Sequence, residues 1–121
     1  GDGMYVRDWI HVSDHCAAIW EVLTKGRIGE VYNIGSNEEH PNMEIVRRIL
    51  KILNKPESLI SHVKDRPGHD RRYAIDAGKI RQELGWAPAI EFENGLRQTI
   101  EWYASNHTWL DRIESGAYRR Y

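Results

Sequence analysis

Residues 4–14 read MYVRDWIHVSD and contain the first strand-to-helix transition of the chain. Tyr5–Ile10 follows a Gly-Asp-Gly turn, and this run predicts a short strand. Ser13 and Asp14 predict the start of a helix, because both residue types favour helix N-termini and an acidic charge is favourable in the first turn. A strand that leads directly into a helix points to an α/β fold.

The next segments continue this alternation. The helix after Asp14 has apolar residues at helical spacing, namely Cys16, Ile19, Trp20 and Leu23. Gly26 and Gly29 mark its end. Residues 30–35 read EVYNIG and predict a buried strand, whereas residues 37–41 predict a polar loop. Asn42 is a suitable N-cap for a helix that continues to about Asn54. Its expected apolar seam is Met43, Val46, Leu50 and Leu53, widened by Ile45, Ile49 and Ile52.

The second half of the chain is predicted to be mainly helical. Its elements are a strand at 59–63, a polar loop at 64–73, a short helix to residue 84, a long helix from 93 or 94, and a last helical stretch at 109–113. Asp76 is expected to cap the short helix, and Gly85 lies where a helix C-terminus favours positive φ. The order of the elements therefore predicts an α/β chain.

Composition places the chain among ordinary folded proteins. Of its 121 residues (14.2 kDa), 40% are hydrophobic and 29% charged, which suffices for a core and argues against disorder. The net charge of −1 disfavours a nucleic-acid partner. No run approaches the roughly 20 apolar residues that cross a membrane, and no signal peptide is visible. Cys16 is the only cysteine, so we expect no disulfide, no Cys-based zinc site and a cytoplasmic setting.

The segment with the most unusual chemistry is residues 65–73, DRPGHDRRY. Its Pro-Gly pair predicts a tight turn, and its three arginines carry the guanidinium forks that suit phosphate oxygens. Together with Lys64, it places four fixed positive charges against two negative ones. The segment is either a solvated surface loop or an anion-binding loop.

Two residues elsewhere are candidates for the same anion. Arg7 lies in an apolar strand, where an arginine either faces solvent on an edge or reaches a buried anion. Asn42 is either only a helix cap or lies among backbone N–H groups that could hold an anion. His11 and His15 are four residues apart but have no acidic third ligand in register, which disfavours a metal site.

The aromatic residues and the cysteine predict packing rather than chemistry. We expect Trp20, Trp86, Trp102, Tyr103 and Trp109 in the core or between helices, and Cys16 buried and inert. The chain has no Gly-rich strand-to-helix turn, Walker motif, nucleophile elbow or Tyr-x-x-x-Lys pair. The residues alone therefore predict an anion-binding loop on an α/β chain, with no complete active site.

Several segments resemble the extended short-chain dehydrogenases. Residues 4–14 are similar to the R-D-[FWY]-[IL]-x-V-x-D segment of these enzymes, and residues 31–35 to the YNIG strand that follows it. Residues 65–76, DRPGHDRRYAID, resemble the signature of one family among them, the dTDP-glucose 4,6-dehydratases. The similarity continues through residues 84–88, 92–103 and 115–118, so it covers essentially the whole chain.

This resemblance implies a fold and residue roles. Residues 1–121 would be the single C-terminal substrate-binding region of a Rossmann-like NAD(P)-binding protein, with short strands and about four to five helices. The Rossmann NAD-binding half would lie outside the chain. The residues that would bind the dTDP-sugar are Arg7, Asn42, Asp65, Arg66, Pro67, Gly68 and His69. A tyrosine near the end contacts substrate in this family, and the resemblance does not decide between Tyr118 and Tyr121.

The implied reaction converts dTDP-glucose to dTDP-4-keto-6-deoxyglucose in dTDP-rhamnose biosynthesis. Bound NAD⁺ takes hydride from C4 of the sugar, water leaves across C5 and C6, and hydride returns to C6. The chain has no matching catalytic, cofactor-binding or metal-binding residue, so we expect it to be inactive alone and to bind no NAD. The expected partners are the nucleotide-sugar and, for the longer enzyme, a second copy of itself.

Other readings stay open. A related dehydratase or epimerase could act on GDP-mannose or a UDP-sugar, although residues 65–76 argue against this. The chain could also be a non-catalytic module that binds nucleotide-sugars or a partner protein, or a remnant with no function. Met4 is not the first residue, and we expect the chain to have been trimmed or to be a piece of a longer protein.

Overall fold

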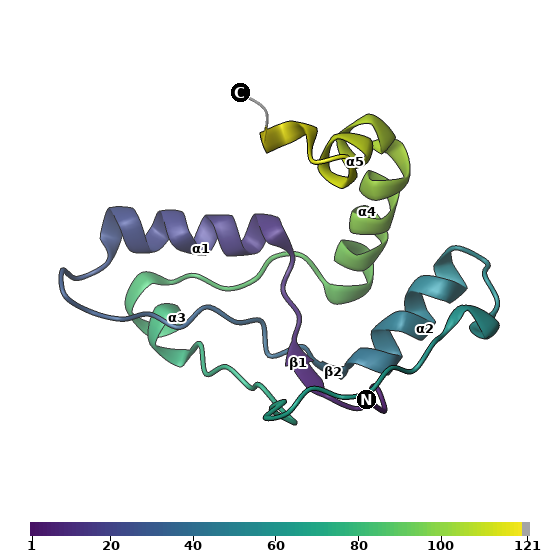
Figure 1. Cartoon of the computed structure of the whole chain (residues 1–121). Coiled ribbons are helices and arrows are strands. Elements are labelled where there is room, and N and C mark those ends of the chain that lie inside the picture. The colour runs from purple at the N-terminus through teal and green to yellow at the C-terminus, as the bar shows by residue number, and fades with distance from the viewer. Residues whose placement is uncertain (120–121) are drawn as a thin grey trace.

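A two-stranded antiparallel sheet lies at the centre of the protein, and helices are arranged around it (Figure 1). The structure is a computed structural model that describes residues 1–119. In this part of the chain the elements are β1 (Val6–Asp8), α1 (Val12–Lys25), β2 (Glu39–Pro41), α2 (Asn42–Ile52), η1 (Glu57–Leu59), α3 (Gly78–Leu84), α4 (Phe92–Ser105), α5 (His107–Glu114) and η2 (Ala117–Arg119). The predicted α/β class, with short strands and several helices, is confirmed.

Strand β1 is hydrogen-bonded along both edges. On one edge it pairs antiparallel with β2, with Arg7 opposite His40. On the other edge Val6 forms a parallel bridge with Arg72, because the Val6 amide donates to the carbonyl of Arg71 and the Val6 carbonyl accepts from Tyr73 (3.0 and 3.1 Å). The polar loop at 64–73 is therefore held beside the strand that carries Arg7.

Asp8 holds the chain segment that leads into β2. Its carboxylate accepts hydrogen bonds from the Ser36 amide and hydroxyl (3.1 and 2.6 Å) and from the Asn37 amide (3.3 Å). Gly35 passes so close that a Cβ there would lie 2.5 Å from an Asp8 carboxylate oxygen and 2.9 Å from Ile75. Only glycine fits this close approach, so Gly35 and Asp8 together set where β2 begins.

Asp14 joins the start of α1 to the segment that precedes α4. Only 5% of this residue is exposed, and its two carboxylate oxygens accept from the amides of Ala89 and Ile90, each at 3.0 Å. A buried carboxylate is tolerated when its oxygens are hydrogen-bonded in this way. Asp14 therefore holds the connector between α3 and α4 against α1.

The largest buried cluster lies between α1 and α3. It consists of Ala18, Ala77, Ile80 and Trp86, with Ile10, Val22, Tyr32, Ile34 and Leu84 packed around it. Asp76 accepts from the Gly78 amide (2.8 Å) at the start of α3, and Gly85 ends that helix with φ 69°. The predicted end at Gly85 is confirmed, whereas the N-cap of α3 is Ala77, one residue after the predicted Asp76.

The strand assignments from sequence were partly wrong. Residues 30–35 and 59–63 form no strand, whereas β2 arises within 37–41, which was predicted to be a loop. The reason is pairing: β1 already uses both of its edges, and no other strand in residues 1–119 is available to 30–35. Val31, expected to be buried, is 76% exposed. Residues 57–59 instead form η1, in which the Ile60 amide donates to Glu57.

Helix starts were also displaced from the predicted caps. In α1 the N-cap is His11, whose Nδ1 accepts from the Ser13 amide at 3.3 Å. In α2 the N-cap is Pro41, so Asn42 is the first helical residue and makes no capping bond. The buried face of α2 therefore contains Met43 and Ile45, whereas two residues of the predicted seam, Val46 and Leu53, are exposed.

Most of the residues predicted to fill the core lie at the surface. Trp86 is buried, but Trp20, Trp102, Tyr103 and Trp109 are all exposed, and the rings of Trp102 and Trp109 meet edge to face at 5.1 Å. Cys16, predicted to be buried, is exposed as well. Cys16 and Trp20 are exposed because, within residues 1–119, no element packs over the outer face of α1. Trp102 and Trp109 lie between α4 and α5, which agrees with the predicted packing between helices.

The long helix and the last helix were predicted correctly. They are α4, which begins one residue before the predicted start, and α5, which contains the whole of 109–113. Among the helices of residues 1–119, none combines the length and the apolar character needed to cross a membrane.

Replacing Asp14 with alanine should destabilise the fold. The amides of Ala89 and Ile90 would lose their acceptors in a partly buried environment, which should lower the free energy of unfolding by about 3 kcal/mol. Urea denaturation followed by tryptophan fluorescence measures the change. The control is Asp111→Ala on the exposed side of α5, which should stay within about 0.5 kcal/mol of the parent. Equal effects of the two substitutions would contradict this role of Asp14.

Candidate functional site

Arg7 and the predicted anion loop meet at the edge of β1 that lies opposite β2. The Nη2 atom of Arg7 donates to Nε2 of His69 (2.9 Å) and to the carbonyl of Asp70 (3.0 Å), and Nη1 donates to the Val6 carbonyl (2.6 Å). The guanidinium lies over the ring of Tyr73, 4.4 Å from its centroid. Arg7 is thus held within the chain by three acceptors and an aromatic face.

The contact with Arg7 indicates which ring nitrogen of His69 carries the proton. A guanidinium only donates hydrogen bonds, so Nε2 of His69 must be the acceptor and its proton must lie on Nδ1. That N–H then donates to Oδ1 of Asp65 at 2.8 Å. The ring of Tyr5 stacks on the imidazole at 3.9 Å and an interplanar angle of 15°. We call Arg7, His69 and Asp65 the site triad.

Asp65 is held in its charged form. It accepts from His69 and also from the amide of Arg66 at 2.9 Å. The hydrogen bond from His69 is the largest effect, and with the Arg66 amide it holds the pKa of the Asp65 carboxyl below its usual range. The bond from Asp65 to His69 closes the turn at residues 66–68, and Gly68 in that turn has φ 67°, which agrees with the tight Pro-Gly turn predicted there.

The three arginines of the loop do not act together. Arg71 pairs with Asp2 at 2.9 Å, and Arg72 forms a two-bond contact with Glu39 at 2.7 and 2.9 Å. Arg66 is exposed, and residues 1–119 supply no hydrogen-bond partner for its guanidinium. The charge excess noted in the sequence is therefore largely neutralised within the chain, and Arg66 is the loop arginine that stays available.

The residues expected to bind the dTDP-sugar are thus only partly brought together. Arg7, Asp65 and His69 are in mutual contact, and Pro67, Gly68 and Arg66 form the turn beside them. Asn42 is connected only through its backbone, since its amide donates to the Tyr5 carbonyl at 2.9 Å. Within residues 1–119 the hydroxyl of Tyr118 accepts a hydrogen bond from Arg119 and contacts none of the site residues, and Tyr121 lies outside the described residues.

Three residues of the site escaped the sequence reasoning: Tyr5, Asp70 and Tyr73. Tyr5 and Arg7 are two residues apart on one strand, a spacing that places their side chains on the same face, so this signal was present. The hydroxyl of Tyr73 donates to the Asp70 carboxylate, and this bond is the main cause that raises the pKa of Tyr73 above its usual range. The positive charges of Arg7 and Arg66 oppose that rise.

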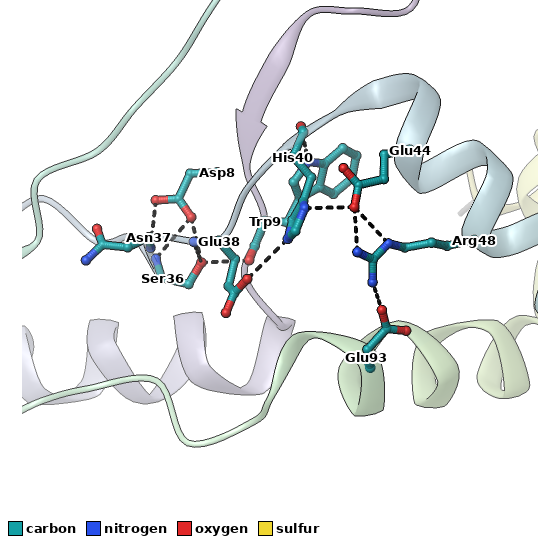
Figure 2. Close-up of polar contacts among 9 residues, drawn as sticks. All are labelled: Asp8, Trp9, Ser36, Asn37, Glu38, His40, Glu44, Arg48 and Glu93. Carbon is teal, nitrogen blue, oxygen red and sulfur yellow. Dashed lines mark hydrogen bonds and ion pairs between the residues drawn. The ribbon is translucent and has the colours of Figure 1, made fainter.

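A second polar network connects the sheet to α2 and α4 (Figure 2). His40 on β2 contacts Glu38 through Nε2 (3.1 Å) and Glu44 through Nδ1 (3.2 Å), while its carbonyl accepts from the indole of Trp9 (3.1 Å). Arg48 pairs with Glu44 on α2 and with Glu93 on α4. The bond from Arg48 is the main cause that lowers the pKa of Glu44. This network supports the strand that carries Arg7.

A cleft of about 490 Å³ lies between the end of β1, α2 and α4, with Trp9, His11, Ile45, Phe92 and Leu96 among its lining residues. None of the site triad lines it. In residues 1–119 there is no group of three or more His, Cys, Asp or Glu side chains placed to hold a metal ion. His11 is occupied as the N-cap of α1, and His15 lies on the helix that follows.

Comparison with known proteins identifies the relatives of this chain. The family model described as GDP-mannose 4,6 dehydratase matches residues 1–99. The chain is 55% identical to a dTDP-glucose 4,6-dehydratase of Xanthomonas campestris pv. campestris and 49% identical to one of Neisseria meningitidis serogroup B. Each alignment covers 98% of this chain but only 36% and 37% of the relative. The chain thus spans little more than a third of the length of these relatives.

Solved structures agree. The dTDP-glucose 4,6-dehydratase of Bacillus anthracis in complex with NAD is 54% identical, with a TM-score of 0.85 over 90% of this chain and 34% of that one. DesIV, the dTDP-glucose 4,6-dehydratase of Streptomyces venezuelae with NAD and TYD bound, is 46% identical, with a TM-score of 0.87 and the same coverage. A UDP-glucose 4-epimerase of Thermotoga maritima is 31% identical, with a TM-score of 0.75 over 87% of this chain and 33% of that one.

Removing the imidazole of His69 should raise the pKa of Asp65. In His69→Ala the carboxylate loses the N–H that stabilises its charged form, so its pKa should move up toward the usual value for aspartate. Carboxyl-detected NMR titration measures the change. The reference group is Glu30, whose pKa is lowered chiefly by Lys79 on another part of the chain and should stay where it is. An Asp65 titration that is unaltered by His69→Ala would show that the contact does not form in solution.

Proposed function

The chain belongs to the GDP-mannose 4,6 dehydratase family, and on that premise we propose that it is the nucleotide-sugar-binding part of a dTDP-glucose 4,6-dehydratase. The observation that carries the proposal is the meeting of Arg7 with the loop at residues 65–73, where Arg66 stays exposed beside the site triad. This places two guanidinium groups and an imidazole at one end of the sheet.

The chemistry of these groups suits a diphosphate. A diphosphate that bridges two sugars carries about two negative charges, and guanidinium forks neutralise and orient such a group through paired hydrogen bonds. Arg7 and Arg66 are the cations, and His69, which is hydrogen-bonded to Arg7, adds a further hydrogen-bonding group. These residues would hold and orient the nucleotide-sugar, and they would not transform its sugar ring.

The choice of dTDP-glucose rests on the relatives. The matching family model carries the name of a GDP-mannose enzyme, but the relatives that are 48–55% identical are named dTDP-glucose 4,6-dehydratase. The UDP-glucose 4-epimerase structure is more distant, at 31% identity. The dTDP-sugar is therefore the nucleotide-sugar that these similarities favour over GDP-mannose and UDP-sugars.

The residues of this chain do not fit NAD, although relatives are described in complex with it. A dinucleotide needs a glycine-rich turn between a strand and a helix, where backbone amides approach the pyrophosphate. Between β1 and α1 the chain has Trp9, Ile10 and His11, with no glycine. We propose that NAD and the groups that transfer protons belong to a part of the enzyme outside residues 1–121. A homodimeric assembly and a cytoplasmic location belong to the same proposal.

The 121-residue chain by itself should not turn over dTDP-glucose. It lacks a cofactor-binding turn and a Tyr-x-x-x-Lys pair, so with dTDP-glucose and NAD⁺ it should form no 4-keto-6-deoxy product. Chromatography of the nucleotide-sugars with detection by mass checks this, with an intact bacterial dTDP-glucose 4,6-dehydratase as the positive control. Product formed by the purified 121 residues would contradict the placement of the chemistry elsewhere.

Arg66→Ala should weaken the binding of dTDP-glucose by the intact gene product. The substitution removes a charge-assisted contact worth roughly 1.5–3 kcal/mol, which is about 10- to 150-fold in Kd. Calorimetry at fixed ionic strength measures Kd. Arg7→Ala should weaken the binding of dTDP-glucose by a similar factor. It also removes the contacts to His69 and Asp70, so Arg66→Ala is the cleaner test.

The matched control is Lys64→Ala. Lys64 is an exposed cation two residues before Arg66, and an exposed charge of this kind should change the affinity by no more than a few-fold. If Arg66→Ala and Lys64→Ala bind dTDP-glucose equally well, the loop is a solvated surface turn and the proposed site is wrong.

A further inference from the structure

Both ring nitrogens of His69 and the Nη2 atom of Arg7 are engaged in hydrogen bonds in this structure. The Nη2 atom of Arg7 is shared between Nε2 of His69 and the Asp70 carbonyl, and Nη1 is bound to the Val6 carbonyl. On the opposite side of the imidazole, Nδ1 is bound to Asp65. A phosphate that binds Arg7 through paired hydrogen bonds uses Nη2, so it competes with the acceptors that Nη2 now serves, His69 and the Asp70 carbonyl.

We propose that binding of a diphosphate at Arg7 is coupled to the uptake of one proton by His69, and that Asp65 is the positioning residue that makes this uptake favourable. The proposal rests on the proposed function, because it takes the diphosphate of a nucleotide-sugar as the anion. It adds a pH dependence to the same site and assigns Asp65 a role that involves no contact with the ligand.

The coupling follows from the lone pair on Nε2. When Nη2 of Arg7 turns to a phosphate oxygen, this lone pair loses its donor and faces a group with about two negative charges. A proton taken from solvent converts Nε2 into an N–H donor toward the phosphate, and the imidazole becomes positively charged. No covalent bond breaks in the protein or the ligand. The hydrogen bond between Arg7 and His69 is exchanged for one from each residue to the anion.

Asp65 favours the charged imidazole without touching the ligand. Its carboxylate accepts the Nδ1 proton at 2.8 Å, and an opposite charge at that distance stabilises an imidazolium. The ring is also fixed in orientation by Tyr5, stacked at 3.9 Å. His69 therefore has a carboxylate on one nitrogen and, in the complex, a phosphate on the other.

The surrounding charges act in both directions. The groups near the imidazole are the cations Arg7, Arg66 and Arg71 with the amino group of Gly1, the carboxylates Asp2, Asp65 and Asp70, and the phenol of Tyr73. In the free protein Arg7 opposes protonation of His69 by its charge and by its position on Nε2. The diphosphate offsets that charge and vacates that position, so protonation becomes favourable when the ligand binds.

The test is calorimetry of the intact gene product with dTDP-glucose, in buffers that have the same pH but different ionisation enthalpies. Both phosphates of this probe are esterified, so the ligand takes up no proton near neutral pH. At slightly alkaline pH the slope of binding enthalpy against ionisation enthalpy should correspond to about one proton taken up, and the affinity should fall up to about tenfold per pH unit.

Variants separate the roles of the two residues. His69→Gln should bind with no proton uptake and no such pH dependence, whereas His107→Gln, on the exposed start of α5, should behave as the parent. Asp65→Asn keeps an oxygen that accepts from Nδ1 but removes the charge, so it should preserve binding and reduce the uptake well below one proton. A purely structural role of Asp65 would not change the number of protons.

The outcomes are distinct. Binding by the parent without proton uptake, or uptake that persists in His69→Gln, overturns this inference and leaves the proposed function intact. Unreduced uptake in Asp65→Asn overturns the role of Asp65. Absence of dTDP-glucose binding by the parent overturns both the proposed function and the inference that rests on it.

Discussion

The main-chain hydrogen bonds on the two edges of β1 are the constraint on which the rest of this structure depends. One edge is paired with β2, and on the other the amide and carbonyl of Val6 are bound to residues 71 and 73. A strand that is bonded on both edges presents less unpaired backbone to other chains. The same bonds bring a loop that is some sixty residues away in sequence beside Arg7, as the 62-residue separation from His69 shows.

Two buried or partly buried aspartates make this arrangement possible, and each acts by accepting backbone amides. Asp8 accepts from the amides of Ser36 and Asn37 and so positions the segment that leads into β2. Asp14 accepts from the amides of Ala89 and Ile90 and so positions the segment that leads into α4. A carboxylate that accepts several N–H groups satisfies otherwise unpaired donors at a chain crossing. In residues 7–14, Arg7 is thus the residue that faces the candidate site, while Asp8 and Asp14 organise the fold.

The candidate site is a set of cations held in place by their own neighbours. Arg71 and Arg72 are paired with carboxylates, Arg7 is held by His69 and the Asp70 carbonyl, and Arg66 is exposed. Such mutual contacts restrict the side chains before a ligand arrives, which reduces the ordering cost of binding. They also connect the cation that would bind an anion to the imidazole of His69.

Several features could be predicted because they depend on neighbours in sequence. The spacing of apolar residues located α1, α4 and α5, Gly85 marked the end of α3, and the Pro-Gly pair marked the turn at Gly68. Arg7, Asp65 and His69 were identified as site residues by their resemblance to a family pattern, and the structure places them in contact.

What the sequence determined by itself was therefore local: helix spans, turns, the residue types of the site and, through similarity, the family. Tertiary structure alone decided which segments pair and which faces are covered. The stretch EVYNIG has the composition of a buried strand but finds no partner in residues 1–119, whereas Glu39–Pro41 becomes a strand because Asp8 brings it to β1. Cys16 and Trp20 are exposed for the same reason. A strand needs a partner for its backbone and an apolar face needs a surface to cover it, and both are supplied by residues distant in sequence.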